Sequence, residues 1–156
     1  MGKKVLIIGG SPRKDGNSAA LCEHFAKGAS EAGTQVEMLS LSGKKIGFCT
    51  ACYACENGNC PQQDDVPGII AKMLDADVIV LATPVYFYTM SAQLKALIDR
   101  SVMVYPKIAK KEFYFIMTMV APKPYFWNEA SCDRHLGYLR LNSCIMALRN
   151  TPSPLP

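Results

Sequence analysis

Two groups of residues in this chain have the types and spacing that chemistry requires. The first is a polar turn at residues 10–18, Gly-Ser-Pro-Arg-Lys-Asp-Gly-Asn-Ser, which directly follows the apolar run 5–8. The second is a set of four cysteines within twelve residues, separated by two, two and four residues: Cys49, Cys52, Cys55 and Cys60. The turn has the parts of a phosphate cradle, and the clustered thiols indicate metal or redox chemistry.

The turn at residues 10–18 predicts a site for a monophosphate. A helix expected over 17–32 would point its free N–H groups and positive dipole end at an anion. No G-x-G-x-x-G occurs, so the turn is not a dinucleotide fingerprint, and Gly16-Asn17-Ser18 stands where a P-loop needs Gly-Lys-Ser/Thr. A capped helix with an ordinary polar turn is the alternative. The side chains expected to hold the phosphate are those of Ser11, Arg13, Asn17 and Ser18.

A second loop, residues 83–90, places a proline and three aromatic residues at the end of an apolar run, 77–83. Clustered on a loop, such side chains suit the face and edge of a planar heterocycle. Backbone groups of Val85 and Tyr86 would read the polar edge of the ring, and Tyr86 and Tyr88 would line an acceptor pocket. A loop packed on its own aromatic rings or on a partner subunit is the alternative.

These loops must be positioned by alternating strands and helices, which predict a doubly wound α/β fold with a parallel sheet. In such sheets a ligand lies outside the carboxyl ends of the strands, so the two loops should meet at one site. The sheet is expected to have a short or incomplete C-terminal edge. The expected strands are 4–9, 34–41, 77–83, 112–120 and 144–148, and the expected helices are 17–32, 64–74, 91–105 and 125–141.

Length and composition favour one domain. The 156 residues are 49% hydrophobic, which fits a single domain over 1–148 followed by a proline-rich tail, 149–156, that we expect to be disordered. No apolar stretch approaches the ~20 residues of a membrane span, and no signal peptide is recognisable, so a cytoplasmic protein is expected. The net charge is +4, and no repeat of basic and aromatic residues suggests nucleic acid.

The two loop motifs, taken in order, resemble the NAD(P)H-dependent FMN reductase family, and within it the iron–sulfur flavoproteins. The resemblance runs from about residue 3 to residue 120 and implies a flavodoxin-like three-layer sandwich with strand order 2-1-3-4-5. It also implies noncovalent FMN and a homodimer or homotetramer. Ser11, Arg13, Asn17 and Ser18 would then hold the FMN phosphate, and the loop after the strand 112–120 would also approach the flavin, loosely at residues 118–120. The residues implied to hold the isoalloxazine ring are Pro84, Val85, Tyr86 and Phe87.

The resemblance also gives the cysteines a role. Iron–sulfur flavoproteins carry a compact cluster motif at this place in the chain, and a [4Fe–4S] cluster on Cys49, Cys52, Cys55 and Cys60 is the first expectation. Zinc is the second metal considered. The thiols could instead be packing residues, a labile disulfide or redox-active groups without a metal.

The function implied is that of an FMN-dependent oxidoreductase that takes hydride from NAD(P)H and passes electrons to a small-molecule or protein acceptor. An electron-transfer module that does not itself turn over NAD(P)H is the alternative, and a nucleotide-binding regulator is a third class. No acid–base residue is assigned, because His24 and His135 are expected to be surface or packing residues. After Val120 the chain departs from the family pattern, which implies that a partner subunit covers the sheet edge or that the chain is shorter than its relatives.

Overall fold

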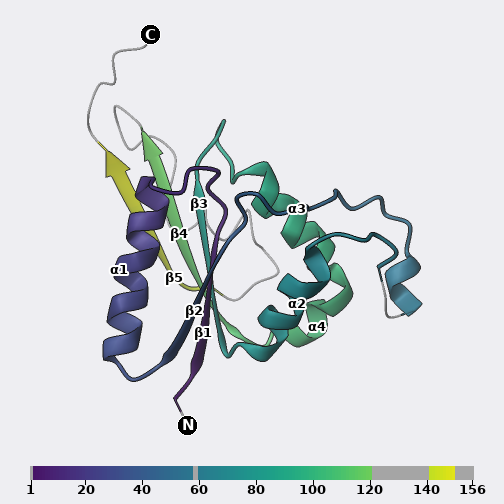
Figure 1. The fold of residues 1–156 in the computed structure, drawn as a ribbon, viewed down its shortest axis with the longest axis horizontal. Coiled ribbons are helices and arrows are strands. Elements are labelled where there is room, and N and C mark those ends of the chain that lie inside the picture. Colours follow the sequence, from purple (N-terminus) through teal and green to yellow (C-terminus); the bar gives the residue numbers. More distant parts are fainter. Residues whose placement is uncertain (1, 58–59, 121–140, 150–156) are drawn as a thin grey trace.

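The computed structural model describes residues 2–57, 60–120 and 141–149. Its centre is a parallel sheet of order β2-β1-β3-β4-β5 (Figure 1). The strands are β1 (Lys4–Gly9), β2 (Gln35–Ser40), β3 (Val78–Pro84), β4 (Glu112–Val120) and β5 (Leu141–Arg149). The helices are α1 (Asn17–Glu31), α2 (Val66–Asp75), α3 (Ala92–Arg100) and α4 (Tyr105–Ile108), with 3₁₀ turns η1 (Ala54–Asn57) and η2 (Ser101–Val104).

The helices form the two outer layers of a three-layer sandwich. Helix α1 lies against one face of the sheet, and α2, α3 and α4 lie against the other (Figure 1). The chain leaves β1 toward β2 and later crosses back to β3 on the other side of β1, so the strand order reverses between β1 and β3. This arrangement confirms the predicted flavodoxin-like fold. The point where the strand order reverses lies beside the two loops at residues 10–18 and 83–90.

The helix predicted over 91–105 is divided into three pieces. Helix α3 ends at Arg100, the 3₁₀ turn η2 follows, and Pro106 stands in the first turn of α4. Because proline has no N–H to donate and clashes with the preceding turn, a continuous helix cannot pass through it. The last strand, predicted over 144–148, is longer than expected, at Leu141–Arg149. The predicted helix 125–141 and the tail lie outside the described residues, apart from residue 141 and residue 149, the two ends of β5.

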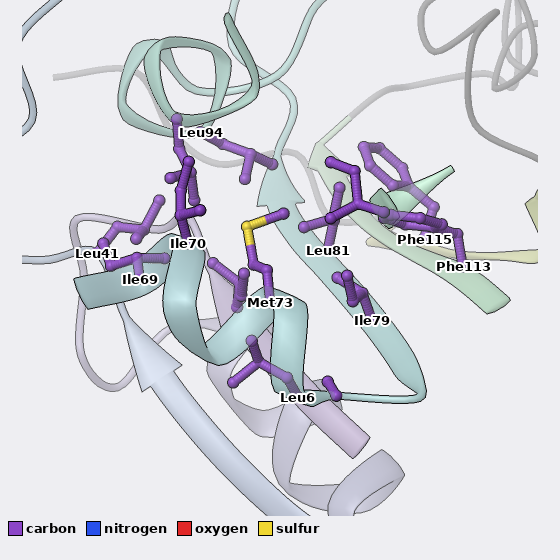
Figure 2. Close-up of a cluster of buried hydrophobic side chains, with 14 of the residues drawn as sticks. Leu6, Leu41, Ile69, Ile70, Met73, Ile79, Leu81, Leu94, Phe113 and Phe115 are labelled. Atoms are coloured by element: carbon purple, nitrogen blue, oxygen red, sulfur yellow. The ribbon is translucent and has the colours of Figure 1, made fainter. Parts of the chain in front are cut away.

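The central strands β1 and β3 are buried because both faces of the sheet are covered there, whereas the edge strand β2 is mostly exposed. Along β1, Leu6 (Figure 2) and Ile8 belong to the larger core beneath α2 and α3, while Val5 and Ile7 belong to the smaller core beneath α1. Successive residues of β1 thus enter one core or the other, and because both cores are apolar, the strand is apolar throughout. Cys22 belongs to the smaller core, where burial raises the pKa of its thiol to about 11, as expected of a packing residue.

None of the helices in the part of the chain that the structure describes is both long and apolar enough to span a bilayer.

Candidate functional site

The turn after β1 is held against the start of α3 at Gly10. The Gly10 N–H donates to the carbonyl of Ala82 in β3 (2.7 Å), and the Gly10 carbonyl accepts from the hydroxyl of Ser91 (2.7 Å). A Cβ at position 10 would lie 2.9 Å from Cβ of Leu94, which is closer than such atoms approach. Only glycine fits here, and the close contact joins the polar turn to the loop after β3.

The polar turn leads into an uncapped helix N-terminus. The N–H of Ala20 is bonded to the Gly16 carbonyl (3.1 Å), and no side chain caps α1 among the described residues. The N–H groups of the first helical turn have no partner within the helix, so they can bind an anion. Ser11 shapes the turn by accepting the N–H of Arg13 (3.2 Å), while Arg13 and Asn17 are exposed.

Ser18 is placed differently from the other predicted phosphate ligands. Its side chain is buried, and its hydroxyl shares a hydrogen bond of 2.7 Å with the hydroxyl of Thr118 in β4. The Thr118 carbonyl in turn accepts the N–H of Val85 (2.8 Å). These two bonds tie the polar turn, the end of β4 and the aromatic loop together. The Ser18 hydroxyl is therefore engaged within the protein and fixes the geometry of the turn.

A cavity of about 280 Å³ lies against the polar turn, between α1 and β2. Its lining combines apolar residues such as Ile7 and Met38 with hydroxyls, two cations and the carboxylate of Glu23. The polar residues that line it include Ser11, Arg13, Lys14, Ser18, Ser40 and Ser42. The turn thus has open space beside it.

The aromatic loop is a strained two-residue turn. Tyr86 and Thr89 exchange backbone hydrogen bonds (2.8 and 3.1 Å), and the two residues between them, Phe87 and Tyr88, have φ of +46° and +65°. Bulky residues rarely adopt this left-handed conformation, which costs of order 1 kcal/mol or more each. The rings remain open, with Phe87 94% and Tyr88 68% exposed. Such strain persists where a site requires it.

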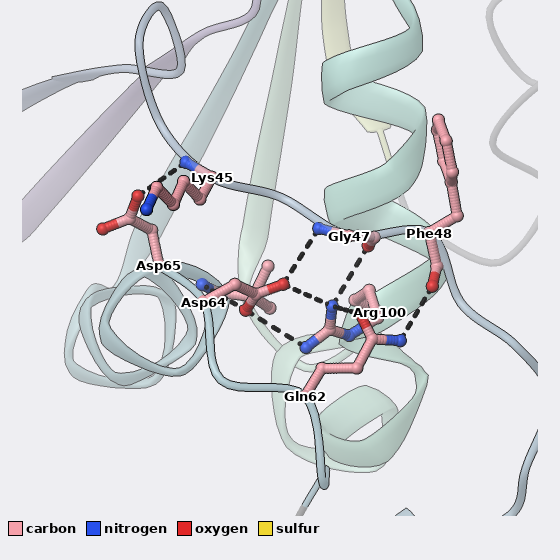
Figure 3. A network of polar contacts seen from close by, with 8 residues as sticks. Lys45, Gly47, Phe48, Gln62, Asp64, Asp65 and Arg100 are labelled. Atoms are coloured by element: carbon pink, nitrogen blue, oxygen red, sulfur yellow. Dashed lines mark hydrogen bonds and ion pairs between the residues drawn. The ribbon is translucent and has the colours of Figure 1, made fainter.

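The cysteine loop, defined here as residues 48–61, has its two ends held by a network around Arg100 (Figure 3). The Arg100 guanidinium donates to Asp64 Oδ2 (2.7 Å), Gln62 Oε1 (2.7 Å) and the Gly47 carbonyl (3.1 Å). Asp64 also accepts the N–H groups of Gly47 (2.9 Å) and Val66 (3.1 Å). The residues just before and just after the loop are thereby fixed to the end of α3.

Electrostatics follow from this network. Burial raises the pKa of Asp64, but the hydrogen bond from Arg100 and then the N–H groups of Gly47 and Val66 outweigh it, so the pKa lies below its ordinary value. Arg100 and Asp64 are nearly inaccessible, with side chains 2% and 9% exposed. Removing one partner would leave an uncompensated charge in a buried place.

The backbone around Cys52 suits a negatively charged sulfur. Ala51 and Tyr53, on either side of it, have φ of +50° and +56°. Left-handed residues next to a ligand position are one element of the anion-binding backbone concavities found at many iron–sulfur sites. The pKa of the Cys52 thiol is lowered, first by a hydrogen bond from the Ala54 backbone and then by one from the Thr50 hydroxyl.

The four thiols do not converge on one point. Cys49 and Cys52 are exposed, Cys55 and Cys60 are half-buried, and none of the four is in a disulfide. Within residues 2–57, 60–120 and 141–149, no three cysteine, histidine or acidic side chains come close enough together to hold a metal ion. Four thiols are the donor set that a [4Fe–4S] cluster takes. To bind one, the four sulfur atoms would have to come closer together than they are in this structure.

The structure therefore brings two of the three predicted groups together. The polar turn and the aromatic loop lie at one edge of the sheet, while the cysteines lie in a loop whose base is at the other end of α3. Sequence reasoning missed Ser91 and Arg100. A signal for Arg100 existed, because it follows Leu94 and Leu97 at intervals of three on the buried stripe of α3.

A parallel sheet whose reversal point carries a phosphate-type turn and an aromatic loop defines a flavodoxin-like ligand-binding protein. Comparison with known proteins narrows this class. The chain belongs to the NADPH-dependent FMN reductase family, whose pattern it matches over residues 3–140.

Individual relatives agree with this family. The chain is 46% identical over 99 residues to an iron-sulfur flavoprotein of Methanocaldococcus jannaschii, a match that covers 63% of this chain and 51% of the relative. It is 39% identical over 102 residues to an iron-sulfur flavoprotein of Methanosarcina thermophila, covering 65% and 53%. The match thus spans about half the length of these relatives.

Solved structures support the fold. An FMN-dependent NADH-azoreductase from Bacillus anthracis, solved in complex with FMN, superimposes with a TM-score of 0.66 at 14% identity. The superposition covers 97% of this chain and 90% of that one. At this identity the likeness establishes the fold alone.

The strain in the aromatic turn can be tested by replacing its two central residues. Phe87→Asn with Tyr88→Gly introduces the pair that favours positive φ, so the free energy of unfolding should rise by about 1 kcal/mol. Urea denaturation measures it. The matched control, Phe87→Ala with Tyr88→Ala, removes both rings but keeps the strain and should give no such gain. Equal stability of the two double variants would contradict the strained turn.

The Asp64 carboxylate predicts a specific acid sensitivity. Because its pKa in the folded chain lies below the ordinary 3.8, it stabilises the fold above that pH, and this contribution is lost as the pH falls below it. Urea unfolding between pH 6 and pH 3 should show a smaller loss of stability for Asp64→Asn, which starts less stable, than for the wild type. Asp99→Asn, which alters an exposed pair with Lys95, should behave like the wild type. Parallel curves for all three proteins would refute the assignment.

Proposed function

We propose that this chain is an FMN-dependent oxidoreductase that accepts hydride from NAD(P)H. One observation carries the proposal: the contact of Gly10 with Ala82 and Ser91 joins a phosphate-type turn and an exposed aromatic turn at the reversal point of the sheet. A ligand with a phosphate at one end and a planar ring at the other matches these two turns. The family, and the names of the relatives, favour FMN over other such ligands.

The phosphate would lie at the start of α1. The uncapped N–H groups of the first helical turn, with the hydroxyl of Ser11 and the amide of Asn17, supply hydrogen-bond donors, and Arg13 supplies charge. These groups would offset the negative charge of the phosphate without the lysine that a P-loop uses. The hydroxyl of Ser18 is bonded to Thr118 and fixes the geometry of the turn.

The ring would lie against the aromatic turn. Pro84 and Val85 are half-buried and Tyr86 and Phe87 are exposed, so the loop offers a backbone edge held by its own hydrogen bonds and an open aromatic surface. The N–H groups of Val85 and Tyr86, expected to read the polar edge of the ring, are already bonded to Thr118 and Thr89. The bond from the Val85 N–H to the Thr118 carbonyl keeps this edge at a fixed height above the sheet. The isoalloxazine of bound FMN would accept a hydride from reduced nicotinamide and pass electrons onward. The residues named here bind and orient the ring and exclude water from it.

Reduction of the flavin by a nicotinamide is the direct test of this activity. FMN-loaded protein mixed anaerobically with NADH or NADPH should lose its flavin absorbance within the turnover time of a reductase. The same protein without a nicotinamide is the control. Flavin that is reduced by dithionite but by neither nicotinamide would overturn the reductase proposal, and reduction by a protein donor would then support the electron-transfer alternative.

The phosphate anchor can be tested separately from the reaction. Asn17→Asp places a carboxylate at the start of α1, where it favours the helix but repels a phosphate, so FMN affinity should fall by at least about tenfold. Riboflavin, which lacks the phosphate, should bind the variant as it binds the wild type, and flavin fluorescence quenching measures both affinities. Lys27→Met, farther along the same helix, should change neither. Equal losses for FMN and riboflavin would place the phosphate elsewhere.

We further propose that Cys49, Cys52, Cys55 and Cys60 ligate a [4Fe–4S] cluster in the loaded protein. Four thiols in a compact motif, the left-handed residues beside Cys52 and the names of the relatives support this. Assay of iron and acid-labile sulfide after anaerobic reconstitution decides it, and zinc bound in place of iron would overturn it. Two further predictions rest on the family resemblance: electrons pass to a small molecule or a protein, and the chain assembles as a homodimer or homotetramer.

A further inference from the structure

Ser18 and Thr118 form a pair of buried hydroxyls from two distant parts of the chain. Ser18 lies in the first turn of α1 and is 3% exposed, and Thr118 lies near the end of β4 and is 7% exposed. Their oxygens are 2.7 Å apart, which is an ordinary length for a hydrogen bond between hydroxyls. One hydroxyl therefore donates and the other accepts.

A second contact holds the same helix against the same strand. Farther along α1, the ring of Phe25 lies against the ring of Tyr114 in β4, with the centroids 5.7 Å apart. Tyr114 and Thr118 are an even number of residues apart on the strand, so their side chains are on the same face of the sheet. The start of α1 is thereby held in place over the end of β4.

One hydrogen of the hydroxyl pair is left over. Each hydroxyl carries one hydrogen, and the bond between the two oxygens uses only one of them. Neither hydroxyl has a second hydrogen-bond partner among residues 2–57, 60–120 and 141–149. A buried donor without an acceptor destabilises the folded state, because it has given up its bonds to water. The spare hydrogen therefore needs an acceptor other than these residues.

The cavity beside the polar turn decides which hydroxyl keeps the spare hydrogen. Ser18 is one of the residues that line this cavity of about 280 Å³, and Thr118 is not. If Ser18 donated to Thr118, the hydrogen of Thr118 would have no acceptor on the described residues and no access to that cavity. If Thr118 donates, the spare hydrogen belongs to Ser18, where solvent or a ligand in the cavity can accept it. The second direction is the more stable one.

We propose that Thr118 is a positioning residue for the phosphate: its hydroxyl donates to Ser18, and the Ser18 hydroxyl donates its own hydrogen to a phosphate oxygen. A hydroxyl that accepts one hydrogen bond is a stronger donor in the next, and a charged acceptor strengthens the bond further. Arg13 and Lys14 line the same cavity and favour a negative charge there. The inference rests on the phosphate site of the proposed function, and it adds a residue of β4 that does not itself touch the phosphate.

The fold separates this role of Thr118 from its role at the aromatic loop. The hydroxyl of Thr118 is bonded to Ser18, whereas its carbonyl accepts the N–H of Val85 (2.8 Å). A substitution of the side chain removes the first bond and keeps the second. Such a change should therefore weaken the binding of a phosphate and leave the binding of a planar ring as it was.

Affinities for FMN and riboflavin, measured by flavin fluorescence quenching, test this assignment. Thr118→Val keeps the shape of the side chain but removes its hydroxyl, and it should weaken FMN binding about three- to tenfold without changing riboflavin binding. Thr118→Ser keeps the hydroxyl and should restore most of the FMN affinity. The matched control is Thr34→Val, which removes a hydroxyl bonded to the Ala29 carbonyl at the other end of α1 and should change neither affinity.

A double-mutant cycle shows whether the two hydroxyls act in series. Ser18→Ala removes the direct donor and should weaken FMN binding by about tenfold. Thr118→Val should add little in that background, because Thr118 acts only through Ser18. In the FMN complex, NMR should also detect a coupling across the hydrogen bond between the Ser18 hydroxyl hydrogen and the phosphorus nucleus. If Thr118→Val does not fold, Thr118→Ala removes the same hydroxyl and takes its place in the cycle.

Three results would overturn the proposal. An unchanged or higher FMN affinity in Thr118→Val would show that this hydroxyl does not orient Ser18 toward a phosphate. Equal losses for FMN and riboflavin would show a general structural role, and losses that simply multiply in the double variant would show that the two hydroxyls act independently. A failure of the proposed phosphate site would look different, because the wild type would then bind riboflavin as tightly as FMN, and both proposals would fall together.

Discussion

The contact between Gly10 and the start of α3 is the constraint on which the rest of the site depends. One peptide unit accepts a bond from Ser91 and another donates to Ala82, at a distance that admits no side chain. Because β1 and β3 are adjacent parallel strands, their carboxyl ends would be near each other in any case. The bonds of Gly10 fix the distance between the phosphate-type turn after β1 and the aromatic turn after β3. A ligand with a phosphate at one end and a planar ring at the other requires such a fixed distance.

Helix α3 extends this constraint to the cysteines. Its first residues are fixed to the polar turn through Ser91, and its last residue, Arg100, is fixed to the base of the cysteine loop through Asp64. A nine-residue helix spans about 14 Å, so the two regions are held apart by a rigid element of set length.

The sequence predicts the parts of the structure that depend on local pattern. The apolar runs of β1 and β3 and the break signal at residue 33 fix the strands and α1 within one or two residues, and the motif order fixes the topology. The end of α3 was missed although Pro106 is a local break signal, and the bond from Arg100 to Asp64, 36 positions away in the chain, could not be predicted from local pattern. Such a contact leaves no local trace.

Strain is equally invisible in the sequence. Nothing in the composition of the aromatic loop indicates that Phe87 and Tyr88 adopt the left-handed region, because both residues disfavour it. The same holds for Ala51 and Tyr53 beside Cys52. In both loops the backbone conformation is opposed by the residue types present. Phe87 is itself predicted to hold the ring, and Ala51 and Tyr53 flank Cys52, a predicted cluster ligand.

The central claim is that one ligand bridges the turn after β1 and the turn after β3, and amide NMR with FMN and riboflavin tests it most directly. FMN should shift the backbone resonances of residues 11–18 and 85–89 together, and riboflavin should shift the second set while leaving the first nearly unchanged. Shifts confined to one turn with FMN, or centred on another part of the chain, would contradict the account.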